Sequence, residues 1–216
     1  MRNIKKISVL IISIMISILL TACEIPLPKI QKSFNPEESM KVYIDVSCMK
    51  DNDDVIDFIG SESEKNVLYV SSKIRIKNML LDQATQSEMN ISDNQIDKIY
   101  EAALRAIDKV EFKIEKVSED DDKAQVKISY NYLDLTNMES DLYKYMEEEV
   151  KNRTIQNKDD AVDLAVDGLI KIYEEAKISD KVYEETYEMH REGRVWIIND
   201  EDKFEKSMGN IVLVNE

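Results

Sequence analysis

The sequence contains few of the residues on which several classes of protein depend. Among 216 residues there are 4 glycines, 3 prolines, 2 cysteines, 1 histidine and 1 tryptophan. So few glycines exclude a Gly-rich phosphate-binding loop, and the scarcity of Gly and Pro favours long regular elements. A structural zinc site needs several Cys or His ligands. The single histidine, His190, is expected on the exposed side of a strand, and nothing places it near a nucleophile. We therefore predict no catalytic residue and no cofactor.

Positive charge is also in short supply. The chain has 29 Lys and Arg against 44 Asp and Glu, for a formal net charge of -15. The phosphates of nucleic acids and the anionic headgroups of lipids repel such a chain. We expect no nucleic-acid partner, and we interpret the acidity as a source of solubility.

The first 23 residues run from charged to apolar to small. Arg2, Lys5 and Lys6 precede an apolar run over residues 7–20, which is the layout of a secretory signal. The run is shorter than the ~20 residues that span a bilayer. It ends in Leu-Thr-Ala-Cys, which resembles the lipobox of bacterial lipoproteins. The resemblance implies cleavage between Ala22 and Cys23 and attachment of diacylglycerol to the Cys23 thiol.

These features predict a signal peptide at 1–22, a lipidated stalk at 23–35 and a single α+β domain at 36–216. The stalk is expected to be extended, because it is rich in proline and lacks apolar periodicity. The protein should lie at the extracytoplasmic face of the cell membrane, held there by its lipid. Cys48 then has no partner for an intrachain disulfide, and its spacing from Met40 and Ile44 predicts burial.

Helical and strand periodicities follow one another along the rest of the chain. Apolar spacing predicts helices over 92–108, 138–151 and 159–176. It also predicts a first helix from residue 36 and a less regular one over 67–81, with Val67, Val70 and Ile74 on the buried face. Alternation predicts strands over 110–117, 125–132, 182–191 and 194–199.

This order predicts an α+β fold in which helices pack on one face of a curved antiparallel sheet built from two hairpins. Trp196 lies on a strand that is apolar on both faces, so it should be buried. We expect Ile172 and Tyr173 of the long helix over 159–176 to cover it, because that helix has the widest apolar stripe.

A resemblance to a known group of proteins follows from three segments: the lipobox, the alternating strand Phe112–Val117 with its acidic turn, and the late strand Gly193–Ile198. Together they resemble the uncharacterised small lipoproteins of Gram-positive bacteria, many of which have a cystatin-like or nuclear-transport-factor-like α+β cone. The resemblance covers about residues 36–208. It implies a fold and a membrane anchor, and it brings no catalytic residues with it.

The acidic segment that begins at Asp51 partly matches a calcium-binding loop. Asp51, Asp53 and Glu62 match the first, third and twelfth positions of an EF-hand. Val55 and Ile56 stand where that loop needs an oxygen ligand and a glycine. We therefore interpret the segment as a solvated turn and predict no metal site.

A group of tyrosines is the remaining candidate for a site. Tyr130, Tyr132, Tyr183 and Tyr187 lie on strands whose apolar faces should meet the helices. They are candidates for core residues or for the lining of a pocket.

We predict a membrane-anchored cell-envelope lipoprotein that binds a small extracytoplasmic ligand or another protein without catalysis. The alternative is a small enzyme that uses a carboxylate such as Asp134 with a tyrosine for proton transfer in the cone. A third possibility is a structural or dimerising module, for which a large exposed apolar patch would be the sign.

Overall fold

An open antiparallel sheet organises the fold. The computed structural model describes residues 32–86 and 90–213. The strands β1 (Phe112–Glu119), β2 (Lys123–Asp134), β3 (Lys177–Glu192) and β4 (Val195–Ile198) follow the order β1-β2-β3-β4. Both expected hairpins are present, and antiparallel pairing of β2 with β3 joins them. A short β5 (Val212–Leu213) adds a parallel pairing at the end of β2.

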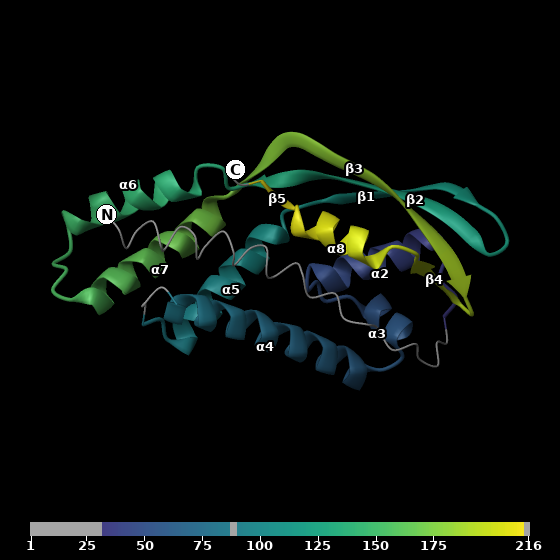
Figure 1. Cartoon of the computed structure of the whole chain (residues 1–216), viewed down its shortest axis with the longest axis horizontal. Helices are drawn as coiled ribbons and strands as arrows, with labels where there is room; N and C mark the ends of the chain where they lie inside the picture. Colours follow the sequence, from purple (N-terminus) through teal and green to yellow (C-terminus); the bar gives the residue numbers. More distant parts are fainter. Residues whose placement is uncertain (1–31, 87–89, 214–216) are drawn as a thin grey trace.

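Seven helices lie within the described residues, and those beside the sheet cover only one of its faces (Figure 1). Those beneath the sheet include α2 and α8, α4 forms the layer farthest from it, and α6 and α7 extend beyond one end. The predicted α+β class and the packing of helices on one sheet face are confirmed. The helices are α2 (Pro36–Ser47), α3 (Asp53–Ile59), α4 (Glu62–Gln86), α5 (Asp93–Ile107), α6 (Met138–Val150), α7 (Lys158–Glu175) and α8 (Glu201–Gly209).

Local sequence explains where several helices begin. Ser92 starts α5 in the predicted capping box, in which its side chain accepts from the Gln95 amide and the Gln95 side chain accepts from the Ser92 amide. Asn35 and Asn157 form the same arrangement at the starts of α2 and α7. The two boxes formed by asparagine were not predicted, although both match the preference of helix starts for Asn.

Strand alternation places the main core beneath the sheet. Val126, Ile128 and Tyr130 of β2 are buried, while Lys127 and Ser129 between them face the open side. The buried side chains pack against a cluster that includes the apolar faces of α5 and α7. One face of the sheet is therefore sealed by helices and the other carries polar side chains, as antiparallel sheets permit.

Trp196 is buried as predicted, with 2% of its surface exposed, but the expected cover was wrong. Strand β4 packs against α2, and the Trp196 amide donates to Ser39 Oγ at 3.1 Å. Helix α7 packs against α5 and α6 instead. Its wide apolar stripe reflects contact with two helices, which a single-sequence pattern does not distinguish from contact with a sheet.

The orientation predicted for the helix over 67–81 was also wrong. Helix α4 covers this segment, but Val67, Val70 and Ile74 are 64%, 56% and 53% exposed. The buried positions are instead Lys65, Ser72 and Ile76, so another side of the helix faces the protein. Lys65 tolerates this position because its long side chain lies along the protein while its ammonium group pairs with Asp51.

The segment just before residue 36 packs against the rest of the fold. Phe34, placed in the stalk by the sequence, is 3% exposed and packs edge-on against Phe58 at 5.3 Å between ring centroids. Its amide donates to the Arg194 carbonyl at 2.8 Å, and Lys32 pairs with Asp54 at 2.7 Å. The physical reason is that one aromatic side chain suffices to attach a segment that has no apolar period of its own.

The remainder of the amino-terminal prediction falls on residues that the structure does not describe. The signal peptide at 1–22 and the stalk up to residue 31 lie outside the described ranges, as do Ala22 and Cys23. Within 32–86 and 90–213, no helix has the length and apolar character needed to cross a membrane.

Cys48 follows the predicted pattern. It is 4% exposed and unpaired, and it belongs to the same core cluster as Met40 and Ile44. Burial raises the pKa of its thiol to about 12, because the thiolate is poorly solvated there. The reactive form of this cysteine is therefore disfavoured at neutral pH.

Candidate functional site

The four tyrosines singled out in the sequence gather beneath the sheet beside α8. The rings of Tyr130 and Tyr183 stack at 4.9 Å between centroids, and Tyr132 lies edge-on to both. The Tyr130 hydroxyl donates to the Ser207 carbonyl at 2.8 Å. The hydroxyls of Tyr183 and Tyr187 both bond to Ser207 Oγ.

Helix α8 packs against this group of tyrosines, and its residue Ser207 forms hydrogen bonds with three of their hydroxyls. Tyr130 and Tyr187 are each 2% exposed, and burial raises the pKa of both hydroxyls. Tyr183 and Ser207 reach a shallow hollow of about 430 Å³ whose other lining residues are mostly charged. The hydroxyls of Tyr130, Tyr183 and Tyr187 are all hydrogen-bonded to Ser207. The main role of this group is therefore to hold α8 against β2 and β3.

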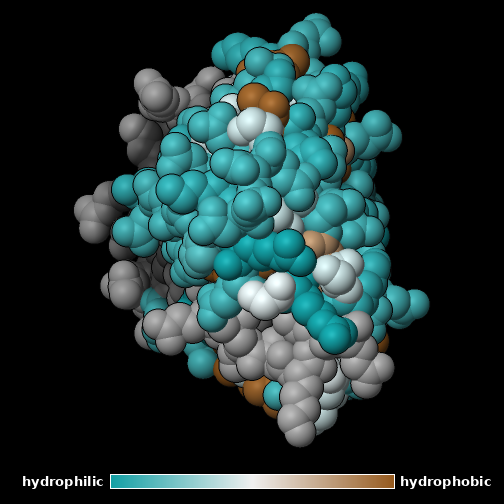
Figure 2. Space-filling view, turned by 90° about the vertical axis from the view of Figure 1, so that its right-hand side faces the viewer, coloured by the Kyte–Doolittle hydropathy of each residue, from teal (hydrophilic) through white to brown (hydrophobic). Residues whose placement is uncertain are grey.

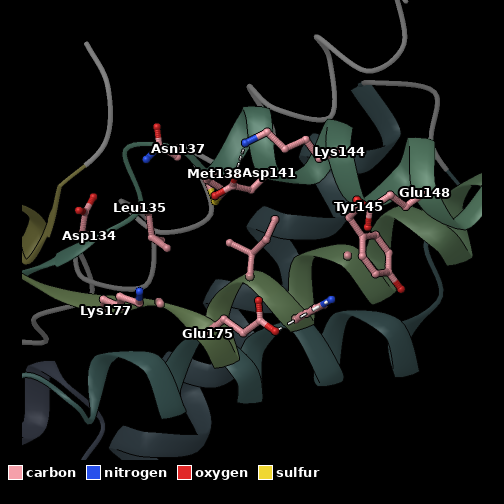
Figure 3. Close-up of a pocket in the computed structure, with 14 residues that line it drawn as sticks. Asp134, Leu135, Asn137, Met138, Asp141, Lys144, Tyr145, Glu148, Glu175 and Lys177 are labelled. Carbon is pink, nitrogen blue, oxygen red and sulfur yellow. Dashed lines mark hydrogen bonds and ion pairs between the residues drawn. The ribbon is translucent and has the colours of Figure 1, made fainter.

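A larger concave feature lies between α6 and α7, at the end of the sheet where β2 ends and β3 begins. We name it the α6–α7 cleft. It has a volume of about 490 Å³, and its side chains are drawn in Figure 3. Its lining consists of Asp134, Leu135, Asn137, Met138, Asp141, Lys144, Tyr145, Glu148, Gly168, Lys171, Ile172, Glu175, Ala176 and Lys177.

The cleft exists because two antiparallel helices meet closely at one point and diverge elsewhere. Gly168 of α7 provides the close approach. A Cβ at that position would lie 2.6 Å from Tyr145 Cδ1 and 2.7 Å from Leu142 Cδ1 of α6. A larger residue at this position would therefore require the Tyr145 and Leu142 side chains, or the helices that carry them, to shift.

Most charged groups in the cleft are already engaged. Asp141 pairs with Lys144 at 3.1 Å. Lys171 lies 5.4 Å from the centre of the Tyr145 ring, a cation–π contact. Asp134 accepts hydrogen bonds from the Thr136 hydroxyl and amide, at 2.7 and 3.0 Å.

The hydrogen bonds from Thr136 hold the pKa of Asp134 below its usual range. The group is therefore an anion at neutral pH.

Two charges in the cleft remain available. Among the described residues, neither the Glu148 carboxylate nor the Lys177 ammonium has a hydrogen bond or ion pair. Lys177 lies at the end of the cleft near Asp134 and Leu135, while Glu148 lies beside Tyr145 at the other end (Figure 3). The cleft therefore offers separated groups of opposite charge with apolar side chains between them.

The other candidates from the sequence lie elsewhere. His190 is exposed, and its Nδ1 lies 2.6 Å from Asn199 Oδ1. Asp51 pairs with Lys65, a residue of α4. Within the described part of the chain, no three His, Cys, Asp or Glu side chains are grouped so that they could hold a metal ion.

Comparison with known proteins places the chain in a family. A family model described as "Domain of unknown function (DUF5105)" matches residues 27–213. The chain belongs to the DUF5105 family. No curated protein matches it.

The fold of this DUF5105 domain is also found in a solved structure. The similar protein is described as a "putative lipoprotein (ycdA) from Bacillus subtilis subsp. subtilis str. 168", with a TM-score of 0.65 and 14% sequence identity. The match covers 83% of this chain and 56% of the Bacillus subtilis chain, so the DUF5105 chain spans little more than half of that protein's length. At this identity the likeness shows a shared fold.

The sequence reasoning identified one residue of the cleft, Asp134. The others come from the loop between β2 and α6, from the two helices and their ends, and from the start of β3, and none belongs to a recognisable motif. A usable signal was Gly168, the only glycine inside a strongly periodic helix, because a glycine in such a place often marks a close packing contact.

Proposed function

We propose that this DUF5105 protein is an exported lipoprotein, anchored through Cys23, that binds a zwitterionic ligand in the α6–α7 cleft. The observation that carries the binding proposal is the pair of unengaged, opposite charges of Glu148 and Lys177 at the two ends of one cleft. The motif Leu20-Thr21-Ala22-Cys23 after an apolar run carries the proposal of an anchor.

The length of the cleft indicates the size of the ligand. Met138 and Glu148 line opposite parts of α6, and the ten residue steps from one to the other rise about 15 Å along the helix. An extended peptide of about four residues covers the same distance. Its carboxylate would pair with Lys177 and its amino group with Glu148, while Leu135, Met138 and Ile172 contact its apolar side chains.

The cleft proposal is tested with short synthetic peptides and calorimetry. Tetrapeptides with free ends should bind, and amidation of the carboxyl end or acetylation of the amino end should each weaken binding. Glu148→Gln and Lys177→Met should each lower affinity about tenfold or more, the effect expected from loss of a charged hydrogen bond. Glu147→Gln and Lys123→Met are matched controls outside the cleft. Equal binding of free and blocked peptides would contradict the proposal.

The anchor is tested separately in cells. Cys23→Ser should block cleavage before residue 23 and release the protein from the membrane fraction, because no thiol remains to carry diacylglycerol. Partitioning into detergent measures this directly. A Cys48→Ser variant is the control, since Cys48 is buried in the domain. Unchanged detergent partitioning of the Cys23→Ser protein would show that the anchor assignment is wrong.

The enzymatic alternative receives less support from the geometry. It requires a carboxylate beside a tyrosine, with a pKa suited to proton transfer. The Asp134 carboxylate has a lowered pKa and bonds to Thr136. The hydroxyls of Tyr130 and Tyr183 bond to Ser207.

A further inference from the structure

Helix α4 exposes a stripe of aliphatic side chains that the rest of the fold leaves uncovered. Val67, Val70 and Ile74 are more than half exposed and follow helical spacing, so they lie on one side of the helix. Their exposed neighbours Asn66 and Ser71 carry no charge. We name Val67, Val70 and Ile74 the α4 stripe.

All three aliphatic residues of the stripe are exposed, while polar residues of the same helix are buried. Burial of aliphatic side chains normally stabilises a fold, yet α4 buries Lys65 and Ser72 and turns all three aliphatic residues outward. Figure 2 shows a largely hydrophilic surface with hydrophobic atoms at both its upper and its lower edge, and α4 lies on the lower side in Figure 1. An outward apolar stripe in an acidic protein indicates a surface that meets another apolar phase.

The stretch of α4 that carries the stripe is less acidic than the chain as a whole, although Glu62 and Glu64 stand in the first turn of the helix. Residues 65–81 contain Lys65, Lys73, Arg75 and Lys77 and no acid, whereas the whole chain has a net charge of -15. Lys73 and Lys77 pair with Asp97 at 3.6 and 3.1 Å, so the surface around the stripe is close to neutral. The stretch that carries the stripe therefore adds no negative charge of its own that an anionic surface would repel.

The stripe also lies on a helix that packs near the start of the described chain, where the proposed lipidated stalk meets the domain. Leu68 and Tyr69 of α4 pack against the small cluster that contains Phe34, two residues after Lys32, the first described residue. From Cys23 to Lys32 the chain can extend over at most about 32 Å. A lipid on Cys23 would therefore hold the α4 side of the domain close to the bilayer at a high effective concentration.

We propose that the α4 stripe contacts the surface of the bilayer to which the protein is anchored, and that it orients the domain with α4 towards the lipid. The proposal rests on the proposed anchor at Cys23. Three aliphatic side chains bind a bilayer weakly by themselves, but the tether supplies the attachment and the stripe supplies only the orientation. The open face of the sheet and its residue Val182 then face away from the membrane.

The test uses the full lipidated chain in vesicles of phosphatidylethanolamine and phosphatidylglycerol. An environment-sensitive fluorophore is attached to Val70→Cys or to the matched control Val182→Cys. The two positions carry the same residue type with 56% and 55% exposure, but they lie in the outermost helix and in the sheet. Cys48 is buried, so labelling is selective for the new cysteine.

We expect the probe at position 70 to show blue-shifted emission and several-fold stronger quenching by a nitroxide lipid than the probe at position 182. With the probe moved to Val67→Cys, the added substitution Val70→Asp should abolish the shift while the protein stays with the vesicles. Equal, water-like emission at both positions in vesicle-bound protein would overturn the orientation and leave the anchor intact. Shielding that increases with protein concentration and resists the nitroxide lipid would overturn it in favour of a second copy. Protein absent from the vesicles would instead show that the anchor itself fails.

Discussion

At the scale of single residues, burial is decided by which side chains a fold can enclose. Trp196 lies in β4 between the sheet and α2 and is 2% exposed, and its amide is satisfied by Ser39. Removing a large ring from such a place leaves a cavity that the surroundings fill only in part.

Trp196→Ala is therefore expected to destabilise the protein by about 3–5 kcal/mol, the range for large truncations in a core. That is a large share of the ~5–15 kcal/mol by which domains are usually stable. Chemical denaturation followed by circular dichroism measures the change. Val182→Ala is the control, because an exposed valine should cost less than about 0.5 kcal/mol. A change of below about 1 kcal/mol for the tryptophan variant would place Trp196 in an open cleft instead of the core.

A strand that is apolar on both faces predicted the burial of Trp196, and helical spacing from Met40 and Ile44 predicted the burial of Cys48. The same reasoning could not find the partners of these residues. Trp196 meets α2, more than 150 residues earlier in the chain, and nothing in a single sequence indicates such a pairing. Glu148 and Lys177 escaped notice for a similar reason, since an isolated charge on a helix or a strand end is ordinary until the fold leaves it unengaged.

At the scale of elements, a periodic pattern identifies a stripe but not the side that the protein covers. In α5 the apolar stripe and the buried side of the helix coincide, because one face is apolar and the other is charged. For α4 they disagree, because its aliphatic stripe faces outward while Lys65 and Ser72 are buried. The sequence reasoning assumed that the apolar side of α4 faces the core, and the long apolar stems of its lysines made the opposite arrangement possible.

The packing of α6 on α7 depends on a single glycine. Replacing Gly168 by Ala should gain up to about 1 kcal/mol from helix propensity. The new methyl group, however, would lie 2.6 Å from Tyr145 and 2.7 Å from Leu142, and overpacking typically costs about 1–3 kcal/mol. We expect net destabilisation and a widened cleft, measured by thermal unfolding and by peptide binding. In a Tyr145→Ala background the penalty should shrink. A Gly168→Ala protein more stable than the wild type would show that α6 moves aside without cost.

At the scale of the whole molecule, the core, the cleft and the α4 stripe lie in different parts of the structure. The sheet and the helices beneath it form the core, and α6 and α7 form the cleft beyond one end of the sheet. Helix α4 is the helix farthest from the sheet (Figure 1). The order of helices and hairpins was sufficient to predict the α+β class. The placement of α6, α7 and α4 around the sheet was not predictable, because it depends on contacts between helices that share similar apolar patterns.

Phe34 joins the segment before α2 to this architecture, and its contribution can be measured. The ring packs in a small cluster with Val42, Phe58 and Val195, so it connects the segment before α2 with α3 and β4. Phe34→Ala should destabilise the domain by about 3–5 kcal/mol if the segment is part of the fold. The neighbouring exposed residue provides the control, because Ser33→Ala should change stability by less than about 0.5 kcal/mol. Proteolysis should also cut the Phe34→Ala protein more rapidly near residue 34. The hydrogen bond from the amide of residue 34 to the Arg194 carbonyl would open more often in this variant. If both variants unfold at the same denaturant concentration, residues 32–35 belong to the stalk after all, and the proposed tether between α4 and the membrane would be four residues longer.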